Sequence, residues 1–144
     1  MTLTPYNLEF SQIKVGDVFS FKKIVNDELV DRFADLVGDY NPLHTDIVYA
    51  KKNGFEGRLA HGLLVGGLFS TLVGMFCPGE RALYLSQSLN FKKPVITGGE
   101  VLVKGEVLDK FESTGIIKLK TTVYDQKNII TVEGEALVKV RPRV

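Results

Sequence analysis

One long segment without charge constrains the fold of this chain more than any other feature. Residues Leu59–Gly79 contain no Asp, Glu, Lys or Arg, and the run is long enough to cross a bilayer. It also carries polar side chains and five glycines, which suit a buried helix better than a membrane span. We therefore predict no membrane segment but a helix over about Gly62–Phe76, ended by Pro78-Gly79. A helix that is apolar on every side must be covered all round.

The residues before this segment indicate one strand and two helices. Val18–Val25 is a short apolar and basic stretch typical of a strand. Asn26 is a suitable N-cap, and the apolar residues after it recur at helical spacing until Gly38. A second, short helix is predicted at about Asp46–Lys52, after a loop formed by Asp39–His44.

After the uncharged segment the apolar period changes from helical to two, which is typical of strands. Turn-forming residues separate four such runs. The predicted strands lie around Leu83–Phe91, Val101–Val107, Ile117–Val123 and Ile130–Val140. The order of one strand, three helices and four strands predicts an α+β fold with a largely antiparallel sheet. The economical arrangement is a curved sheet wrapped around the long central helix.

Composition excludes several classes of function. The chain has 144 residues with 18 Lys and Arg against 17 Asp and Glu, a net charge of +1. That length suits one domain over residues 1–144, and the near-neutral charge argues against a nucleic-acid partner. The one cysteine, Cys77, cannot form an internal disulfide, which fits a reducing compartment, so we expect a cytoplasmic protein. No targeting segment is apparent at the N-terminus.

Motifs for cofactors and metals are missing from the sequence. No Gly-x-Gly-x-x-Gly, phosphate-binding loop or Gly-x-Ser-x-Gly elbow occurs. His44 and His61, the two histidines, stand 17 residues apart with a single cysteine, which is not a zinc spacing. We expect no cofactor and no metal.

The loop Gly38–His44 concentrates chemical groups within seven residues. Asp39 precedes His44 by five residues across the turn that Pro42 stiffens, so both side chains can reach one water molecule. A carboxylate beside an imidazole is a common arrangement for general acid–base catalysis. The alternative is that Asp39 caps a turn while His44 packs in the core.

The second histidine lies where the long helix begins. His61 and Gly62 stand at its N-terminus, where unpaired backbone N–H groups meet the positive end of the helix dipole. Gly62 would let a ligand oxygen approach these donors as in an oxyanion hole; an ordinary helix start is the alternative. Ser70 follows eight residues later on nearly the same face, although a serine in an apolar helix usually bonds to its own backbone.

These residues together resemble a known family. The string Gly38-Asp39-Tyr40-Asn41-Pro42-Leu43-His44 resembles the signature of the MaoC-like (R)-specific enoyl-CoA hydratases, which adopt the hotdog fold. The similarity continues through Leu59–Leu64, Leu68–Ser70 and Tyr84–Phe91, and about 15–140 fits one such domain. The resemblance implies a single hotdog fold, a curved sheet wrapped around a long central helix.

The resemblance also assigns roles. Asp39 and His44 correspond to the catalytic pair that activates water and transfers its proton, and the N–H of Gly62 corresponds to the donor to the thioester carbonyl. Ser70 falls where the family has a serine near the substrate. At the substrate site we also place His61, at the helix start, and Asn41, which is expected to fix the loop rather than react.

The expected activity is hydration of a trans-2-enoyl-CoA to the (R)-3-hydroxyacyl-CoA, and its reverse, without a cofactor. The same reaction on an acyl carrier protein is one alternative. An acyl-CoA thioesterase is a second, and a non-catalytic acyl-binding module is the third. The resemblance further implies a homodimer, or an oligomer built from dimers, with the acyl thioester bound along the subunit interface.

Overall fold

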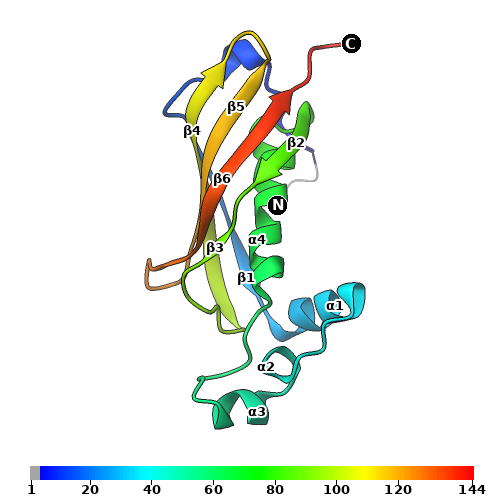
Figure 1. Cartoon of the computed structure of the whole chain (residues 1–144), viewed down its shortest axis with the longest axis vertical. Helices are drawn as coiled ribbons and strands as arrows, with labels where there is room; N and C mark the ends of the chain where they lie inside the picture. Colours follow the sequence, from blue (N-terminus) through cyan, green and yellow to red (C-terminus); the bar gives the residue numbers. More distant parts are fainter. Residues whose placement is uncertain (1–3) are drawn as a thin grey trace.

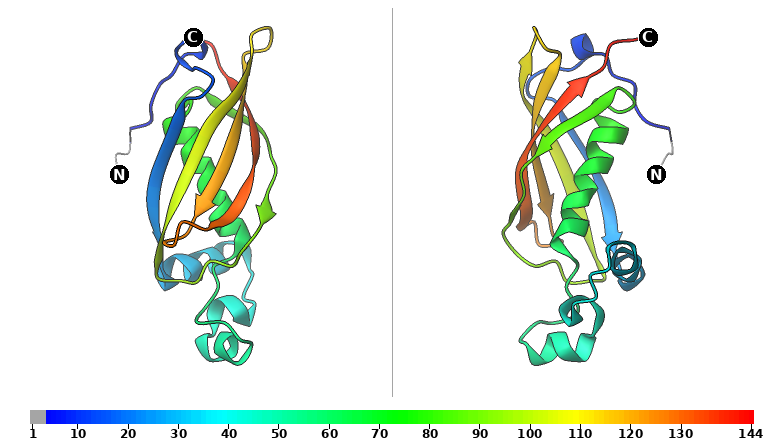
Figure 2. Two further views of the ribbon diagram at one scale, coloured as in Figure 1. Left: turned by 90° about the vertical axis from the view of Figure 1, so that its left-hand side faces the viewer. Right: turned by 45° about the vertical axis from the view of Figure 1, so that its right-hand side comes forward.

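The computed structural model describes residues 4–144 and has one antiparallel sheet of six strands curved around a helix (Figures 1 and 2). The sheet order is β1-β4-β5-β6-β2, with the short β3 paired to β6. The strands are β1 (Val18–Val25), β2 (Ala82–Gln87), β3 (Asn90–Phe91), β4 (Gly99–Phe111), β5 (Ile116–Tyr124) and β6 (Ile130–Val140). This arrangement is the hotdog fold, and the α+β prediction is confirmed.

The central helix is α4 (Gly62–Thr71), continued by a π-helical turn over Leu72–Phe76. Val65, Phe69 and Leu72 on its inner side are at most 1% exposed and pack against the sheet. The prediction of a helix covered all round is wrong for a single chain. Leu63 is 63% exposed, and Gly67 and Ser70 follow it on the same open side, because the sheet wraps only part of the helix.

The first strand and helix begin and end close to where the sequence predicts. The Asn26 side chain accepts a hydrogen bond from the N–H of Leu29 and so caps α1 (Asp27–Val37). Gly38 ends the helix at φ 81°, a left-handed conformation that glycine adopts without strain.

Two short helices follow α1 and lie beyond the start of α4 (Figure 1). α3 (Ile47–Lys52) was predicted, and the Asp46 side chain caps it. α2 (Pro42–Thr45) corrects the prediction of a loop over Asp39–His44. Asn41 caps this single turn and Pro42 occupies its first position, where the missing N–H costs nothing.

The predicted strand Leu83–Phe91 is two strands, β2 and β3, and both pair with β6. Within β2, the pairing with β6 shifts register between Tyr84 and Ser86. Leu83 and Leu85 are 52% and 49% exposed, whereas Tyr84 is half-buried and packs against the core. The alternation therefore places the leucines outward, on the edge strand of the sheet.

No helix within residues 4–144 has both the length and the apolar character needed to cross a membrane.

Burial of Cys77 gives a testable consequence. The side chain is 1% exposed, and burial raises the pKa of its thiol from 9.0 to about 12. Because only the thiolate is nucleophilic, a disulfide reagent such as Ellman's reagent should modify the native protein at pH 8 roughly 1,000-fold more slowly than the unfolded chain. The folded state disfavours the thiolate, so this group lowers stability as the pH rises from about 9 toward 12. Equal labelling rates for native and unfolded protein would contradict the burial.

Candidate active site

The turn after α1 presents Asp39 and His44 to each other. Asp39 Oδ1 accepts a hydrogen bond from the N–H of Asn41 at 3.1 Å, and Asn41 Oδ1 accepts from the N–H of Leu43 at 3.0 Å. These bonds fold the loop so that Asp39 Oδ2 lies 3.9 Å from His44 Nε2. That separation is too long for a direct hydrogen bond and suits a water molecule placed against both groups.

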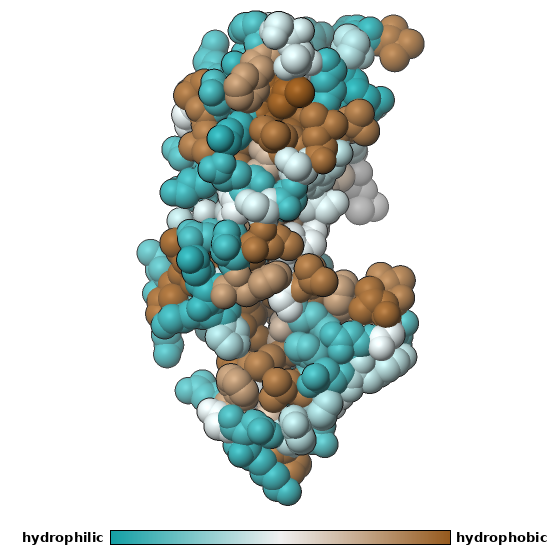
Figure 3. Space-filling model, viewed as in Figure 1, coloured by the Kyte–Doolittle hydropathy of each residue, from teal (hydrophilic) through white to brown (hydrophobic). Residues whose placement is uncertain are grey.

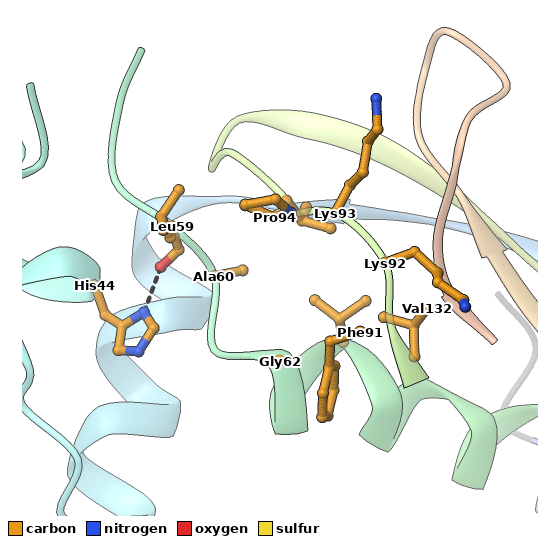
Figure 4. A pocket seen from close by; sticks show the side chains of 11 residues that line it. His44, Leu59, Ala60, Gly62, Phe91, Lys92, Lys93, Pro94 and Val132 are labelled. Atoms are coloured by element: carbon orange, nitrogen blue, oxygen red, sulfur yellow. Dashed lines mark hydrogen bonds between the residues drawn. The ribbon is translucent and has the colours of Figure 1, made fainter. Parts of the chain in front are cut away.

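A backbone carbonyl sets the tautomer of His44. The ring Nδ1 lies 2.7 Å from the carbonyl oxygen of Leu59 (Figure 4). A carbonyl can only accept, so Nδ1 carries the hydrogen and Nε2 is left with a lone pair. Because Nε2 faces Asp39, the imidazole can receive a proton at that position.

His61 packs directly on this pair. Its side chain is 2% exposed, and its ring stacks on His44 with centroids 3.9 Å apart. Nε2 of His61 lies 3.0 Å from the carbonyl oxygen of Asp39, and Phe33 contacts the ring from α1 with centroids 4.9 Å apart. His61 therefore contacts both members of the pair: the backbone carbonyl of Asp39 and the ring of His44.

A cavity of about 240 Å³ connects His44 with the N-terminus of α4 (Figure 4). Gly62 begins the helix here, and the side chain of Phe91 lies against it (Figure 4). A Cβ added to Gly62 would come within 2.8 Å of the Phe91 ring, so a larger residue here would displace that ring. Lys92 and Lys93 also line the cavity, which is otherwise mostly apolar.

The three groups of Asp39, His44 and His61 lie within 4.8 Å of one another, close enough to contact one ion. His61 Nε2, however, is directed to the carbonyl of Asp39, so in this hydrogen-bond pattern it carries a hydrogen. A metal would need that nitrogen deprotonated. The donor set suits proton transfer better than metal binding, and the absence of a metal stays a prediction.

The structure brings Asp39, His44, His61 and Gly62 together and leaves Ser70 apart. Ser70 lies two turns farther along α4, about 12 Å at 1.5 Å per residue, and is exposed on the open side of the helix. Its place near the substrate stays a prediction. Asn41 serves as a cap, as expected.

Sequence reasoning missed Arg58 and Phe91. Arg58 is 9% exposed, and its Nε donates a hydrogen bond to the carbonyl oxygen of His44 at 2.6 Å. The available signal was that Arg58 is the one charged residue between Glu56 and Glu80. A lone charge beside a buried helix needs partners.

Comparison with known proteins places this geometry in a family. Residues 11–129 match the family described as MaoC like domain. The chain is 40% identical over 128 residues to the (R)-specific enoyl-CoA hydratase of Aeromonas caviae, covering 89% of this chain and 96% of that protein. It is 38% identical over 127 residues to the mitochondrial 3-hydroxyacyl-[acyl-carrier-protein] dehydratase of Arabidopsis thaliana, covering 86% and 75%.

A solved structure shows the same fold. The unliganded R-hydratase PhaJ1 from Pseudomonas aeruginosa superposes with a TM-score of 0.90 at 32% identity, covering 95% of this chain and 88% of that one. The matches of sequence and fold show that the chain belongs to the MaoC-like family of hydratases and dehydratases.

Proposed function

We propose that this protein is an (R)-specific enoyl-CoA hydratase, which also runs in reverse as a 3-hydroxyacyl-CoA dehydratase. The observation that carries the proposal is the Asp39–His44 pair, 3.9 Å apart, beside a cavity that ends on the N-terminus of α4. The names of the relatives from Aeromonas caviae and Pseudomonas aeruginosa support the substrate class and the (R) configuration.

The chemistry needs three groups, and each has a candidate. A water between Asp39 and His44 attacks the β-carbon of the acyl chain and gives one proton to the pair. The pair returns one proton to the α-carbon, so that the elements of water are added across the double bond. The N–H of Gly62 stabilises the enolate charge that develops on the thioester oxygen.

Two lysines at the mouth of the cavity also support a second candidate function, the same reaction on an acyl carrier protein. Lys92 and Lys93 lie there and are exposed, and Lys92 pairs with Glu133 at 3.5 Å. Two lysines suit either the phosphates of CoA or an acidic carrier surface. The relative from Arabidopsis thaliana acts, by its name, on the carrier-bound substrate.

Crotonyl-CoA distinguishes hydration from hydrolysis. Loss of the enoyl-thioester absorbance without release of free thiol is the expected result. Thiol release from crotonyl-CoA or butyryl-CoA would instead identify a thioesterase. Turnover of crotonyl-acyl carrier protein at a much higher kcat/KM than crotonyl-CoA would select the carrier-bound substrate.

We also propose that two copies pair along β2 and the open side of α4. β2 is an edge strand with exposed Leu83 and Leu85, and Figure 3 shows apolar surface gathered over this region. An uncovered apolar edge invites pairing with another chain. Leu63 and Gly67 are exposed on the open side of α4, and a second copy that covered them would also lie next to Ser70.

Gly67→Arg tests the dimer without disturbing the single chain. A Cβ at Gly67 meets nothing within 4 Å, and Gly is a poor helix former, so the variant should fold. We expect a native mass of twice 16.0 kDa for the wild type and for Gly67→Ala, and the mass of one chain for Gly67→Arg. Light scattering after gel filtration measures this. A dimeric Gly67→Arg variant would exclude this surface.

The single free thiol of Cys77 supports a reducing compartment, and we propose the cytoplasm. We also propose that residues 1–144 form one MaoC-like domain with its core at about 15–140.

A further inference from the structure

One arginine lies behind the Asp39–His44 turn and connects α1 with α2. Arg58, whose side chain is 10% exposed, donates from Nε to the carbonyl oxygen of His44 at 2.6 Å. Its Nη2 donates to Asp31 Oδ1, and its Nη1 lies 3.5 Å from Asp27 Oδ1. One guanidinium thus joins α1 to the last turn of α2.

The planar geometry of arginine allows these contacts at once. A guanidinium presents five N–H donors in a fixed fork, whereas a lysine ammonium is a point charge on a flexible stem. Asp27 and Asp31 are one helical turn apart on α1 and face the same group. The third acceptor, the carbonyl of His44, belongs to the end of a helix only four residues long, which has little internal support of its own.

The residue after Arg58 holds the other side of His44. The carbonyl oxygen of Leu59 accepts from His44 Nδ1 at 2.7 Å, and the N–H of Leu59 donates to the carbonyl of Leu43 at 2.9 Å. Arg58 therefore binds the backbone oxygen of His44, and Leu59 binds both the ring Nδ1 of His44 and the carbonyl of Leu43. A shift of α2 would change both the ring tautomer and the direction of Nε2.

We infer that Arg58 is a positioning residue for His44: it ties the backbone of His44 to α1, so that Nδ1 stays on Leu59 and Nε2 faces Asp39. It touches no reacting atom. The kinetic part of this inference rests on the proposed hydratase function, whereas the tautomer part does not.

Arg58→Met should lower kcat for crotonyl-CoA by roughly 10- to 100-fold, because a misplacement of about 1 Å at a catalytic group has that effect. KM should stay within about threefold, since the residue makes no substrate contact. Arg58→Lys keeps the charge beside Asp27 and Asp31, so it is the variant to use if Arg58→Met does not fold. It lacks the fork and should still lose roughly fivefold or more in kcat.

Arg81→Met is the matched control. Arg81 is 7% exposed and donates to the carbonyl of Arg141 at 3.4 Å. It directly precedes β2, whose first residues lie at the end of the sheet far from α2 (Figure 1). Loss of this second buried arginine should lower the thermal midpoint without lowering kcat below the assay temperature.

The tautomer of His44 separates positioning from a general effect on stability. If Arg58 only stabilised the fold, its replacement would leave this tautomer unchanged. The chain has two histidines, so long-range ¹⁵N–¹H spectra of the imidazoles, with His61→Gln for assignment, resolve His44 alone. The wild type and Arg81→Met should show hydrogen on Nδ1. Arg58→Met, or Arg58→Lys in its place, should show a mixture of Nδ1-H and Nε2-H.

An unchanged His44 tautomer in the folded Arg58 variant would overturn the inference, as would a kcat within threefold of wild type. If wild-type protein does not hydrate crotonyl-CoA, the proposed function fails, but the tautomer spectra still decide whether Arg58 positions His44.

Discussion

Replacing His44 with Ala should lower kcat for hydration of crotonyl-CoA by about 100- to 10,000-fold, the usual contribution of a general acid–base group. Asp39→Asn should have an effect of the same size, because a neutral amide cannot take a proton from the water placed between Asp39 and His44 Nε2, which lie 3.9 Å apart. Initial rates followed by the loss of enoyl-thioester absorbance measure both.

Asp46→Asn is the matched control for the aspartate. Asp46 caps α3 by accepting hydrogen bonds from the N–H groups of Val48 and Tyr49, and asparagine caps about as well. It should keep its activity. The double variant of Asp39 and His44 should be little slower than either single one, because the two groups act as a unit. Wild-type activity in either folded single variant would remove that residue from the mechanism.

Removal of the N–H of Gly62 should have the second large effect. Proline has no N–H yet is well tolerated at the first position of a helix. His61 is already at φ −59°, ψ 132°, a conformation suited to a residue before proline. Since any added Cβ would contact the ring of Phe91 at 2.8 Å, the comparison is made with Phe91→Ala present in both variants.

In that background, Gly62→Pro should have a kcat about 100- to 1,000-fold lower than Gly62→Ala, the loss typical of one oxyanion-hole donor. Both variants add carbon at the same place and lack the same aromatic ring, so they differ chiefly in the N–H. Equal rates would show that the enolate is stabilised elsewhere.

The elements with local signals were predictable from the sequence. α1 lies where Asn26 and Gly38 indicate, because an N-cap side chain and a left-handed glycine are properties of single residues. Asp39 and His44 face each other as the five-residue spacing across Pro42 suggests. Their catalytic roles, and those of Gly62, Ser70, His61 and Asn41, stay predictions.

What was missed depends on contacts between residues distant in the chain. His61 stacks on His44 across 17 positions, and Arg58 reaches back to the carbonyl of His44 across 14. No local pattern encodes such contacts. The outward direction of Leu83 and Leu85 was missed for a related reason, since alternation predicts a strand but not which face is covered.

Chiral analysis of the product formed from crotonyl-CoA tests the proposed reaction most directly. Wild-type protein should give (R)-3-hydroxybutyryl-CoA, and Asp39→Asn should form it about 100- to 10,000-fold more slowly. Formation of the (S) product, or (R) product at an undiminished rate from Asp39→Asn, would contradict hydration at the Asp39–His44 pair.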